Sequence, residues 1–269
     1  MKSSILSRHW GRHPTKHLEG SREAAANMAP EPIPMLLVTD IGRDIDDTVA
    51  MIALSTYESE GFFKLVGVIA TGGAGEERAR VTRFWLRRLG YKDEDVPVAA
   101  CYAPGKPICL LPNAEPGVPS FEDAAIFRGS CKEKSAGELI LQLAKEHHGK
   151  LQILAIAPFS SIADALDTEE NTEVIRKGVA KLYIQGQATI NEDDGRLSPD
   201  FLAFNLSENK EASNTVFEKL QDHIPFQLLS KHAAYRVSML REDFLGWDQS
   251  AGDHVMTDQA RNGLTAFRK

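Results

Sequence analysis

The sequence predicts an α/β fold, a mostly parallel open sheet with helices on both faces. Short apolar runs of strand length, the first at Met35–Val38, alternate with longer segments in which apolar residues recur every three or four positions. Because parallel strands are joined by crossover helices, this repeated alternation predicts βαβ units along the chain.

The composition is that of an ordinary globular protein and argues against several classes. The chain has 269 residues, of which 42% are hydrophobic, enough for one large α/β domain. No stretch approaches the roughly 20 apolar residues of a membrane helix, so we expect no membrane partner. A net charge of −7 argues against a nucleic-acid surface, which needs clustered Lys and Arg. The three cysteines have no C-x-x-C spacing, which favours reduced thiols and a cytoplasmic location.

The first 33 residues differ from the rest, and we expect them to form a basic, disordered N-terminal extension. Residues 1–27 carry five Lys or Arg residues, and no acidic residue precedes Glu19. A basic, Ser-containing segment is also typical of organelle transit peptides, so organellar targeting is an alternative to a simple tail. The expected α/β domain covers residues 34–269.

Six apolar runs are the expected strands. They lie at 35–38, 65–70, 96–100, 151–157, 181–184 and 226–229. The expected helices lie at 47–57, in a charged segment ending at 89, at 136–147, as one or two helices over 160–177, and at 208–220. Residues 102–134, which contain five prolines, and residues 187–203 are expected to be long loops.

The candidate site lies in the loops that follow the expected strands. The carboxyl ends of parallel strands meet at one edge of a sheet, and ligands bind beyond that edge. The corresponding loops are 39–47, 70–75, 157–161 and 185–205. The first of them has the most distinctive composition.

Four carboxylates, at Asp40, Asp44, Asp46 and Asp47, lie within eight residues after the first expected strand. Only Arg43 offers a counter-charge locally, so mutual repulsion of the carboxylates favours a bound cation. Hard carboxylate oxygens without nearby His or Cys favour Ca²⁺ or Mg²⁺ over zinc. Capping of the next helix by Asp46 or Asp47 is an alternative, but it explains only one or two of the four carboxylates.

Three segments resemble motifs of the inosine-uridine-preferring nucleoside hydrolases. Residues 40–47 read DIGRDIDD, similar to the family's signature D-T-D-I-G-N-D-I-D-D, with Val38 where the family usually has its first aspartate. Residues 154–163 read LAIAPFSSIA, similar to L-A-x-G-P-L-T-N-L-A, and residues 203–212 read AFNLSENKEA, similar to E-F-N-x-x-x-D-P-E-A. The motifs occur in the family's order over about residues 34–240, and the resemblance implies a Rossmann-like nucleoside hydrolase fold.

The resemblance also implies a function, Ca²⁺-dependent hydrolysis of the N-glycosidic bond of ribonucleosides to ribose and free base. It implies that Asp40, Asp47 and the backbone carbonyl of Ile156 bind Ca²⁺, and that Asp40 is also the base for the attacking water. Asp46 would bind the ribose 2′-hydroxyl, and Asn205 would hold the sugar. A nucleoside is the expected partner, and a homodimer or homotetramer is the expected assembly. These residue types suit an oxocarbenium-like transition state, which needs a carboxylate base and fixed acceptors for the ribose hydroxyls.

Three departures from the family's pattern bear on activity. Ala203 replaces a glutamate on the 5′-hydroxyl side, and Ala74 stands where many relatives carry a ribose-facing Asn. The family's C-terminal His-Asp pair has no match, since Asp253-His254 has the reverse order. We therefore expect a C-terminally short or divergent member of the family.

Two other functions remain open from the sequence. A non-catalytic relative that binds a nucleoside or ribose would account for these departures. Residues 44–48 also read DIDDT, which fits D-x-D-x-T, the nucleophile motif of haloacid-dehalogenase-like phosphatases, with Asp44 as nucleophile and Asp46 as general acid. The position of Asp44, several residues beyond Val38, disfavours a phosphatase, because that nucleophile directly follows its strand.

Overall fold

The computed structural model describes residues 31–42, 45–72, 75–101, 135–234 and 236. The chain divides into two units, Met1–Glu31 and Pro32–Lys269, and all the helices and strands described here belong to the second. The extension expected over 1–33, apart from its last residues, and the loop expected over 102–134 lie outside the described part of the chain.

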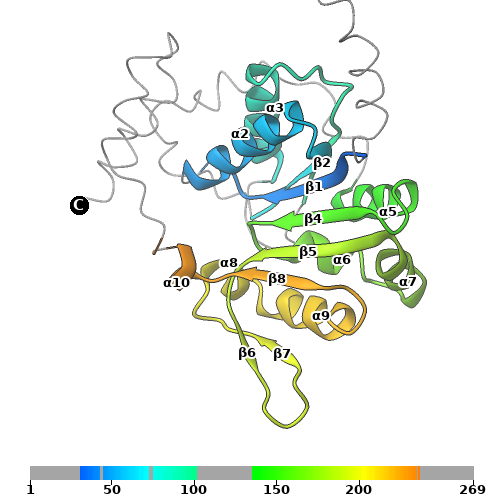
Figure 1. The fold of residues 1–269 in the computed structure, drawn as a ribbon, viewed down its shortest axis with the longest axis vertical. Coiled ribbons are helices and arrows are strands. Elements are labelled where there is room, and N and C mark those ends of the chain that lie inside the picture. The colour runs from blue at the N-terminus through cyan, green and yellow to red at the C-terminus, as the bar shows by residue number, and fades with distance from the viewer. Residues whose placement is uncertain (1–30, 43–44, 73–74, 102–134, 235, 237–269) are drawn as a thin grey trace, which may run out of the picture. The chain divides into compact units, whose positions relative to one another are not determined.

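A six-stranded sheet forms the centre of the second unit, in the order β3-β2-β1-β4-β5-β8. Every neighbouring pair in it is parallel, and Figure 1 shows β1, β4, β5 and β8 side by side. The strands are β1 Ile33–Thr39, β2 Phe63–Ala70, β3 Val98–Ala100, β4 Leu151–Ala155, β5 Val179–Gln185 and β8 Phe226–Leu229. The expected parallel sheet is confirmed, and each strand overlaps the apolar run that predicted it.

The central strand β1 shows why the sheet strands are continuous apolar runs. Its side chains alternate between the two faces: Leu36 and Val38 belong to one hydrophobic core, and Met35 and Leu37 belong to the other. All four are buried. Because both faces of the sheet are covered, the strand has no polar face, as is typical of parallel sheets.

Helices cover both faces of the sheet, as the sequence predicted. The core on the side of Met35 and Leu37 includes buried residues of α2 (Ile45–Ser59) and α3 (Gly75–Arg88). The other core includes buried residues of α5 (Ala136–Glu146), α6 (Ser160–Asp164), α7 (Glu169–Gly178) and α9 (Lys210–Leu220). Among the described residues, no helix is both long enough and apolar enough to cross a membrane.

Polar side chains cap the N-termini of three of these helices. The Ser135 hydroxyl accepts from the Glu138 N–H at 3.2 Å, and the Glu138 carboxylate accepts from the Ser135 N–H at 2.9 Å, which together cap α5. Thr168 caps α7, and Asn209 caps α9. Each cap satisfies a backbone N–H that the first helical turn leaves without a partner. The Thr168 cap also explains why the region 160–177 contains two helices.

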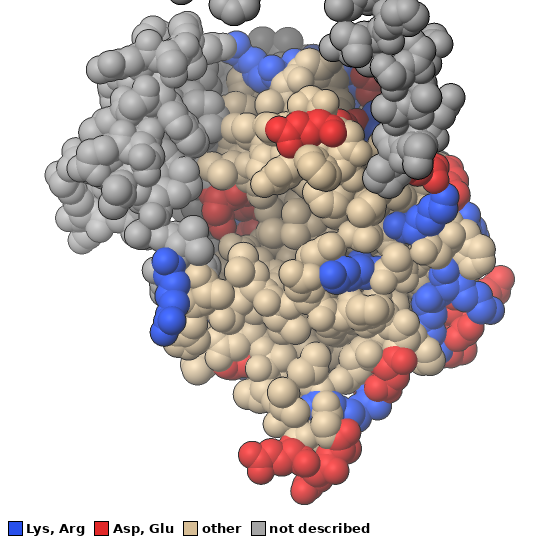
Figure 2. Space-filling view, in the orientation of Figure 1, with Lys and Arg blue, Asp and Glu red and all other residues tan. Residues whose placement is uncertain are grey.

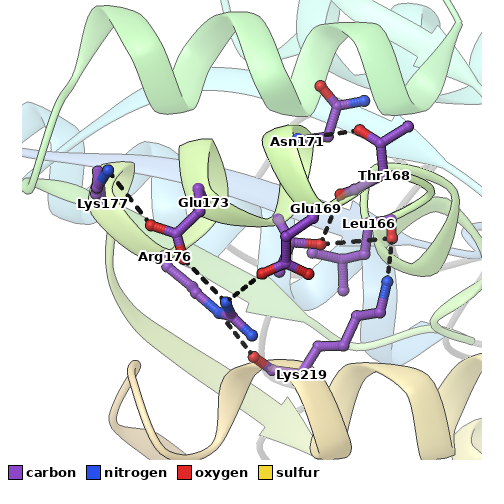
Figure 3. A network of polar contacts seen from close by, with 9 residues as sticks. Leu166, Thr168, Glu169, Asn171, Glu173, Arg176, Lys177 and Lys219 are labelled. Carbon is purple, nitrogen blue, oxygen red and sulfur yellow. Dashed lines mark hydrogen bonds and ion pairs between the residues drawn. The ribbon is translucent and has the colours of Figure 1, made fainter.

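The side chain of Arg176 joins α7 to α9 (Figure 3). It donates from Nε to the Lys219 carbonyl at 3.1 Å and from Nη1 to Glu169 and Glu173 at 2.8 and 2.9 Å. The Lys219 ammonium in turn donates to the Leu166 carbonyl at 2.5 Å. These contacts hold α9 against α7 on the same face of the sheet.

The segment 187–203, expected to be a loop, contains a hairpin, which corrects that expectation. The hairpin pairs β6 (Ala188–Ile190) with β7 (Leu197–Pro199) in antiparallel fashion. Each strand has three residues that are at least partly exposed, so neither carries the apolar run that marks a strand of the main sheet. Figure 2 shows acidic side chains at the tip of this hairpin, where residues 192–194 are exposed.

Two short helices complete the described fold. α9 (Lys210–Leu220) confirms the helix expected over 208–220, and α8 (Phe204–Ser207), which was not predicted, precedes it. α10 (Lys231–Ala234) follows β8. The first of these two matters for the site, because it carries Asn205.

Candidate functional site

The order in which strands are added to the sheet reverses between β1 and β4, although the two strands are parallel. From β1 the chain moves outward to β2 and β3, then crosses back to β4 and moves outward again to β5 and β8. The loops after β1 and β4 therefore leave the sheet toward opposite faces. In open α/β sheets, ligands bind at the carboxyl ends of the strands beside such a reversal. The acidic loop after β1 lies at this position.

Hydrogen bonds from Thr39, the last residue of β1, hold the acidic loop. The Thr39 hydroxyl donates to Asp47 Oδ1 at 2.5 Å and accepts from the Ile41 N–H at 3.2 Å. Asp47 lies in the first turn of α2 and is 2% exposed, and Asp40 is 8% exposed. Gly42 lies between them with φ +105°. The loop therefore buries two carboxylates at the end of β1.

The residues after β2 lie directly against Asp40. The Thr71 N–H donates to the Thr39 carbonyl at 2.9 Å, which continues the pairing of β1 and β2 beyond the sheet. A Cβ placed on Gly72 would lie 2.8 Å from the Cβ of Asp40, so only glycine fits beside this aspartate. Gly72 also has φ +87°, a conformation that glycine adopts without steric cost. The turn after β2 thus restricts where Asp40 can lie.

The residues after β4 contribute from the other side of β1. The Ile156 N–H donates to the Val38 carbonyl at 3.0 Å, so Ile156 lies next to the end of β1. The Ile156 carbonyl accepts from Asn205 Nδ2 at 2.9 Å. The carbonyl predicted to bind metal and the amide predicted to hold the sugar are therefore in direct contact.

Gln185, the last residue of β5, connects Asn205 to the acidic loop. Its Oε1 accepts from Asn205 Nδ2 at 3.0 Å, and its Nε2 donates to Asp46 Oδ2 at 3.1 Å. Asp46 is exposed in the first turn of α2, whereas Gln185 and Asn205 are partly buried. Side chains from α2, β5 and α8 therefore meet in one chain of hydrogen bonds.

Arg78 brings a buried positive charge to the acidic loop. It lies in α3, is 3% exposed, and donates from Nη1 to the Ile41 carbonyl at 2.9 Å. In the sequence, only Arg43 lies close to the four carboxylates, and Arg78 was not predicted because it lies 37 positions beyond Ile41. The protein itself therefore supplies part of the charge balance of the loop.

The residues predicted for the site all lie at the carboxyl edge of the sheet. They are Asp40, Asp46, Asp47, Ile156 and Asn205.

The structure also describes two of the residues that depart from the family's pattern. Val38 is fully buried in the core, and Ala203 is 9% exposed at the N-cap of α8. Neither presents a polar side chain to the site. Asp44 and Ala74 lie outside the described residues. Three further residues at the site, Thr39, Arg78 and Gln185, were not predicted, because their residue types carry no functional signal by themselves.

The donor atoms near β1 and β4 suit a hard divalent cation in their chemistry. Carboxylates and backbone carbonyls are the oxygen ligands that Ca²⁺ and Mg²⁺ prefer, and Ca²⁺ takes about six to eight of them. Within the part of the chain that the structure describes, no group of three or more His, Cys, Asp and Glu side chains is placed to hold a metal ion. Asp40, Asp47 and the Ile156 carbonyl would therefore need water, substrate or further residues to complete a cation site.

A buried thiol, Cys101, lies near the same edge of the sheet, just after β3. It is 3% exposed, and its Sγ donates to Asp164 Oδ2 at 3.7 Å. Burial raises the pKa of the Cys101 thiol to about 11, and burial also raises the pKa of the Asp164 carboxyl. Because the thiol is protonated at neutral pH, it is not a nucleophile there.

An open parallel sheet with buried carboxylates at its strand reversal defines a Rossmann-like α/β protein with an acidic site. The model of the inosine-uridine preferring nucleoside hydrolases matches residues 35–267. The chain therefore belongs to this family of hydrolase enzymes, and the resemblance seen in its three motifs is confirmed. No curated protein matches the sequence significantly.

Solved structures share this fold. The type III effector protein XopQ, complexed with adenosine diphosphate ribose, matches with a TM-score of 0.70 and 23% identity over 94% of this chain and 71% of XopQ. A purine-preferring ribonucleoside hydrolase from Gardnerella vaginalis matches with a TM-score of 0.63 and 19% identity, over 87% of this chain and 73% of that one. The inosine-uridine preferring nucleoside hydrolase from Bacillus anthracis matches with a TM-score of 0.60 and 18% identity, over 86% of this chain and 76% of that one. These matches bear out the nucleoside hydrolase fold.

Proposed function

We propose that the protein hydrolyses the N-glycosidic bond of ribonucleosides to give ribose and free base. The observation that carries this proposal is the hydrogen-bonded group of Asp46, Gln185 and Asn205 beside the buried carboxylates of Asp40 and Asp47. Fixed oxygen acceptors suit the hydroxyls of a ribose, and a carboxylate suits the activation of water. Membership of the family supports the same class of reaction.

In the proposed mechanism, Asp46 and Asn205 orient the sugar, and Asp40 accepts a proton from the attacking water. The glycosidic C–N bond breaks with its electron pair on the departing nucleobase, which takes up a proton from solvent, and the nearby carboxylates stabilise the positive charge that develops on the sugar ring. Asp40 suits the role of base because its position is restricted by the close approach of Gly72. A base held in one position loses little entropy when the reaction begins.

We further propose Ca²⁺ as the cofactor, held by Asp40, Asp47 and the Ile156 carbonyl. When bound, Ca²⁺ would supply positive charge that lowers the pKa of water at the site. Two of these ligands, Asp47 and the Ile156 carbonyl, also accept a hydrogen bond from another side chain. Thr39 donates to Asp47, and Asn205 donates to the Ile156 carbonyl. Such contacts orient ligands in advance and raise metal affinity.

Release of free base from inosine, uridine and adenosine tests the proposed reaction. We expect at least one of the three to be cleaved in the presence of Ca²⁺ and cleavage to stop when EGTA removes the metal. The relative rates then define the preferred base. A chain that releases no base from any of the three, with Ca²⁺ present, would contradict the proposal.

A second candidate function is the binding of a ribose-containing nucleotide without turnover. Two observations favour it: Val38 and Ala203 present no polar side chain to the site, and the similar fold of XopQ holds adenosine diphosphate ribose. Calorimetric titration with adenosine diphosphate ribose separates the two functions. Binding of this nucleotide, together with no cleavage of any nucleoside, would favour the binding function over hydrolysis.

A further inference from the structure

The side-chain amide of Gln185 lies between the two side chains predicted to hold the sugar. It accepts from Asn205 Nδ2 at 3.0 Å and donates to Asp46 Oδ2 at 3.1 Å. The register of β5 against β4 produces this position, since Ile184 pairs with Ala155 and Gln185 follows directly. None of the three family motifs includes Gln185, so its role was not implied by the resemblance.

The direction of every hydrogen bond in this group is determined by its two ends. The Ile156 carbonyl at one end and the Asp46 carboxylate at the other can only accept. Asn205 must therefore turn its NH₂ group toward Ile156, and Gln185 must turn its NH₂ group toward Asp46. The Gln185 oxygen then faces Asn205. Rotating either amide by half a turn would place two donors or two acceptors against each other.

This arrangement decides what the site offers to a ligand. Asn205 uses both hydrogens of Nδ2, one on Ile156 and one on Gln185, so only its oxygen Oδ1 remains for a ligand. Asp46 likewise offers only acceptor oxygens. Two acceptors held by one bridging amide suit two neighbouring hydroxyl donors, such as the adjacent hydroxyls of a pentose.

We infer that Gln185 is a positioning residue, which fixes the Asn205 amide and the Asp46 carboxylate as a pair of acceptors for the hydroxyls of a riboside. It acts through those two side chains and not on the reacting atoms. The inference deepens the proposed function and depends on it for the identity of the sugar. A methionine at this position would preserve the length of the side chain and remove both hydrogen bonds.

The test compares Gln185→Met with a matched control, Gln152→Met. Gln152 lies near the amino end of β4, away from the site edge, and its Oε1 accepts from the Tyr183 hydroxyl at 3.0 Å. Both glutamines are partly buried in strands of the same sheet, so loss of packing should be similar. Gln185→Glu is a second variant, which can still accept from Asn205 but places a like charge beside Asp46.

The readouts are hydrolysis of p-nitrophenyl β-D-ribofuranoside, whose leaving group avoids any base preference, and calorimetric binding of D-ribose. In Gln185→Met we expect KM to rise about tenfold or more, because a hydrogen bond to a charged group is lost and its partners are released. We expect kcat to change less than about threefold, because Gln185 does not touch the reacting atoms. Gln185→Glu should raise KM at least as much, and Gln152→Met should leave both constants unchanged.

A second comparison tests whether Gln185 acts through Asn205. In an Asn205→Ala background, Gln185→Met should weaken D-ribose binding less than it does in the wild-type background, because one of its two contacts is already absent. Residues within one hydrogen-bond network show this non-additivity, whereas independent structural effects add. Fully additive losses would overturn the inference.

The remaining outcomes separate this inference from the proposed function. If the wild-type chain binds D-ribose but hydrolyses no riboside, and Gln185→Met still binds about tenfold more weakly, hydrolysis is excluded and the role of Gln185 stands. Equal behaviour of folded Gln185→Met and wild type would overturn the inference. It would also be overturned by equal losses in Gln185→Met and Gln152→Met, or by a wild-type chain that binds no D-ribose and cleaves no riboside.

Discussion

The Thr39 hydroxyl donates to Asp47 Oδ1 at 2.5 Å and joins the end of β1 to the first turn of α2. Both residues are almost completely buried, at 0% and 2% exposure. A buried carboxylate is costly unless hydrogen bonds or positive charges compensate it. The Thr39 contact provides part of that compensation and fixes one of the two oxygens of Asp47.

We predict that Asp47→Ala abolishes Ca²⁺ binding and that Thr39→Val weakens it about tenfold. The first change removes a ligand, and the second removes a hydrogen bond to a charged group, a loss of about 1.5–3 kcal/mol. Calorimetric titration with Ca²⁺ measures both. Thr56→Val in α2 is the control, since the Thr56 hydroxyl is exposed and donates only along its own helix to the Ile52 carbonyl. Wild-type Ca²⁺ affinity in Asp47→Ala would refute the assignment of Asp47 as a ligand.

Asp40→Asn should lower turnover of the preferred nucleoside by about 100-fold or more while the chain stays folded. The substitution keeps the size of the side chain and one acceptor oxygen but removes the charge that makes it a base. Initial rates of base release measure the loss, and thermal unfolding checks the fold.

Asp44→Asn distinguishes this mechanism from the phosphatase alternative. Under nucleoside hydrolysis we expect a much smaller effect than that of Asp40→Asn. Under the phosphatase hypothesis Asp44 is the nucleophile, and its loss would abolish hydrolysis of p-nitrophenyl phosphate. An inactive Asp44→Asn beside an active Asp40→Asn would therefore reverse the assignment of roles.

The sheet could be predicted from the sequence because its strands are covered on both faces. Met35–Val38 and Leu65–Ala70 are continuous apolar runs for that reason, and such runs are visible without a structure. The acidic loop could be placed as well, since carboxylates directly after a buried strand must lie at the edge where strands end. Asp40 and Asp47 could therefore be assigned to the carboxyl edge of the sheet before the structure was known.

Gln185 and Arg78 could not be predicted, because each reaches the acidic loop across a long stretch of chain. Gln185 contacts a residue 139 positions away, and Arg78 contacts one 37 positions away. A glutamine at the end of a strand and an arginine in a charged helix are both common. Only the strand register and the packing of α3 against the loop give these two side chains their contacts.

The close approach of Gly72 to Asp40 leads to a prediction about both stability and activity. Gly72→Ala adds a Cβ 2.8 Å from the Cβ of Asp40 and forces a non-glycine residue into φ +87°. We expect a loss of about 1 kcal/mol or more in the free energy of unfolding and a fall in turnover of about tenfold or more, because Asp40 must move. Urea unfolding and initial rates measure the two effects.

Gly90→Ala is the matched control for this prediction. Gly90 has φ +91°, close to that of Gly72, but a Cβ placed there meets no atom within 4 Å. The control should therefore lose a similar amount of stability from backbone strain and keep wild-type turnover. Wild-type turnover in Gly72→Ala would show that the contact with Asp40 does not restrict the base.

The buried thiol of Cys101 predicts a loss of stability at high pH. Burial raises its pKa in the folded chain from the ordinary 9.0 to about 11. Between these two values the unfolded chain releases the thiol proton and the folded chain retains it, so the free energy of unfolding falls as pH rises. Below pH 9 both states hold the proton, and Cys101 contributes no pH dependence.

Urea unfolding of wild type and Cys101→Ala at pH 8 and pH 10.5 isolates this contribution. Burial also raises the pKa of Tyr91, to about 12, but Tyr91 is present in both chains and its contribution cancels in the difference. We expect the stability of wild type relative to Cys101→Ala to fall by about 1–2 kcal/mol between the two pH values. A constant difference would mean that the pKa of the thiol is the same in the folded and unfolded chains, and would contradict the prediction.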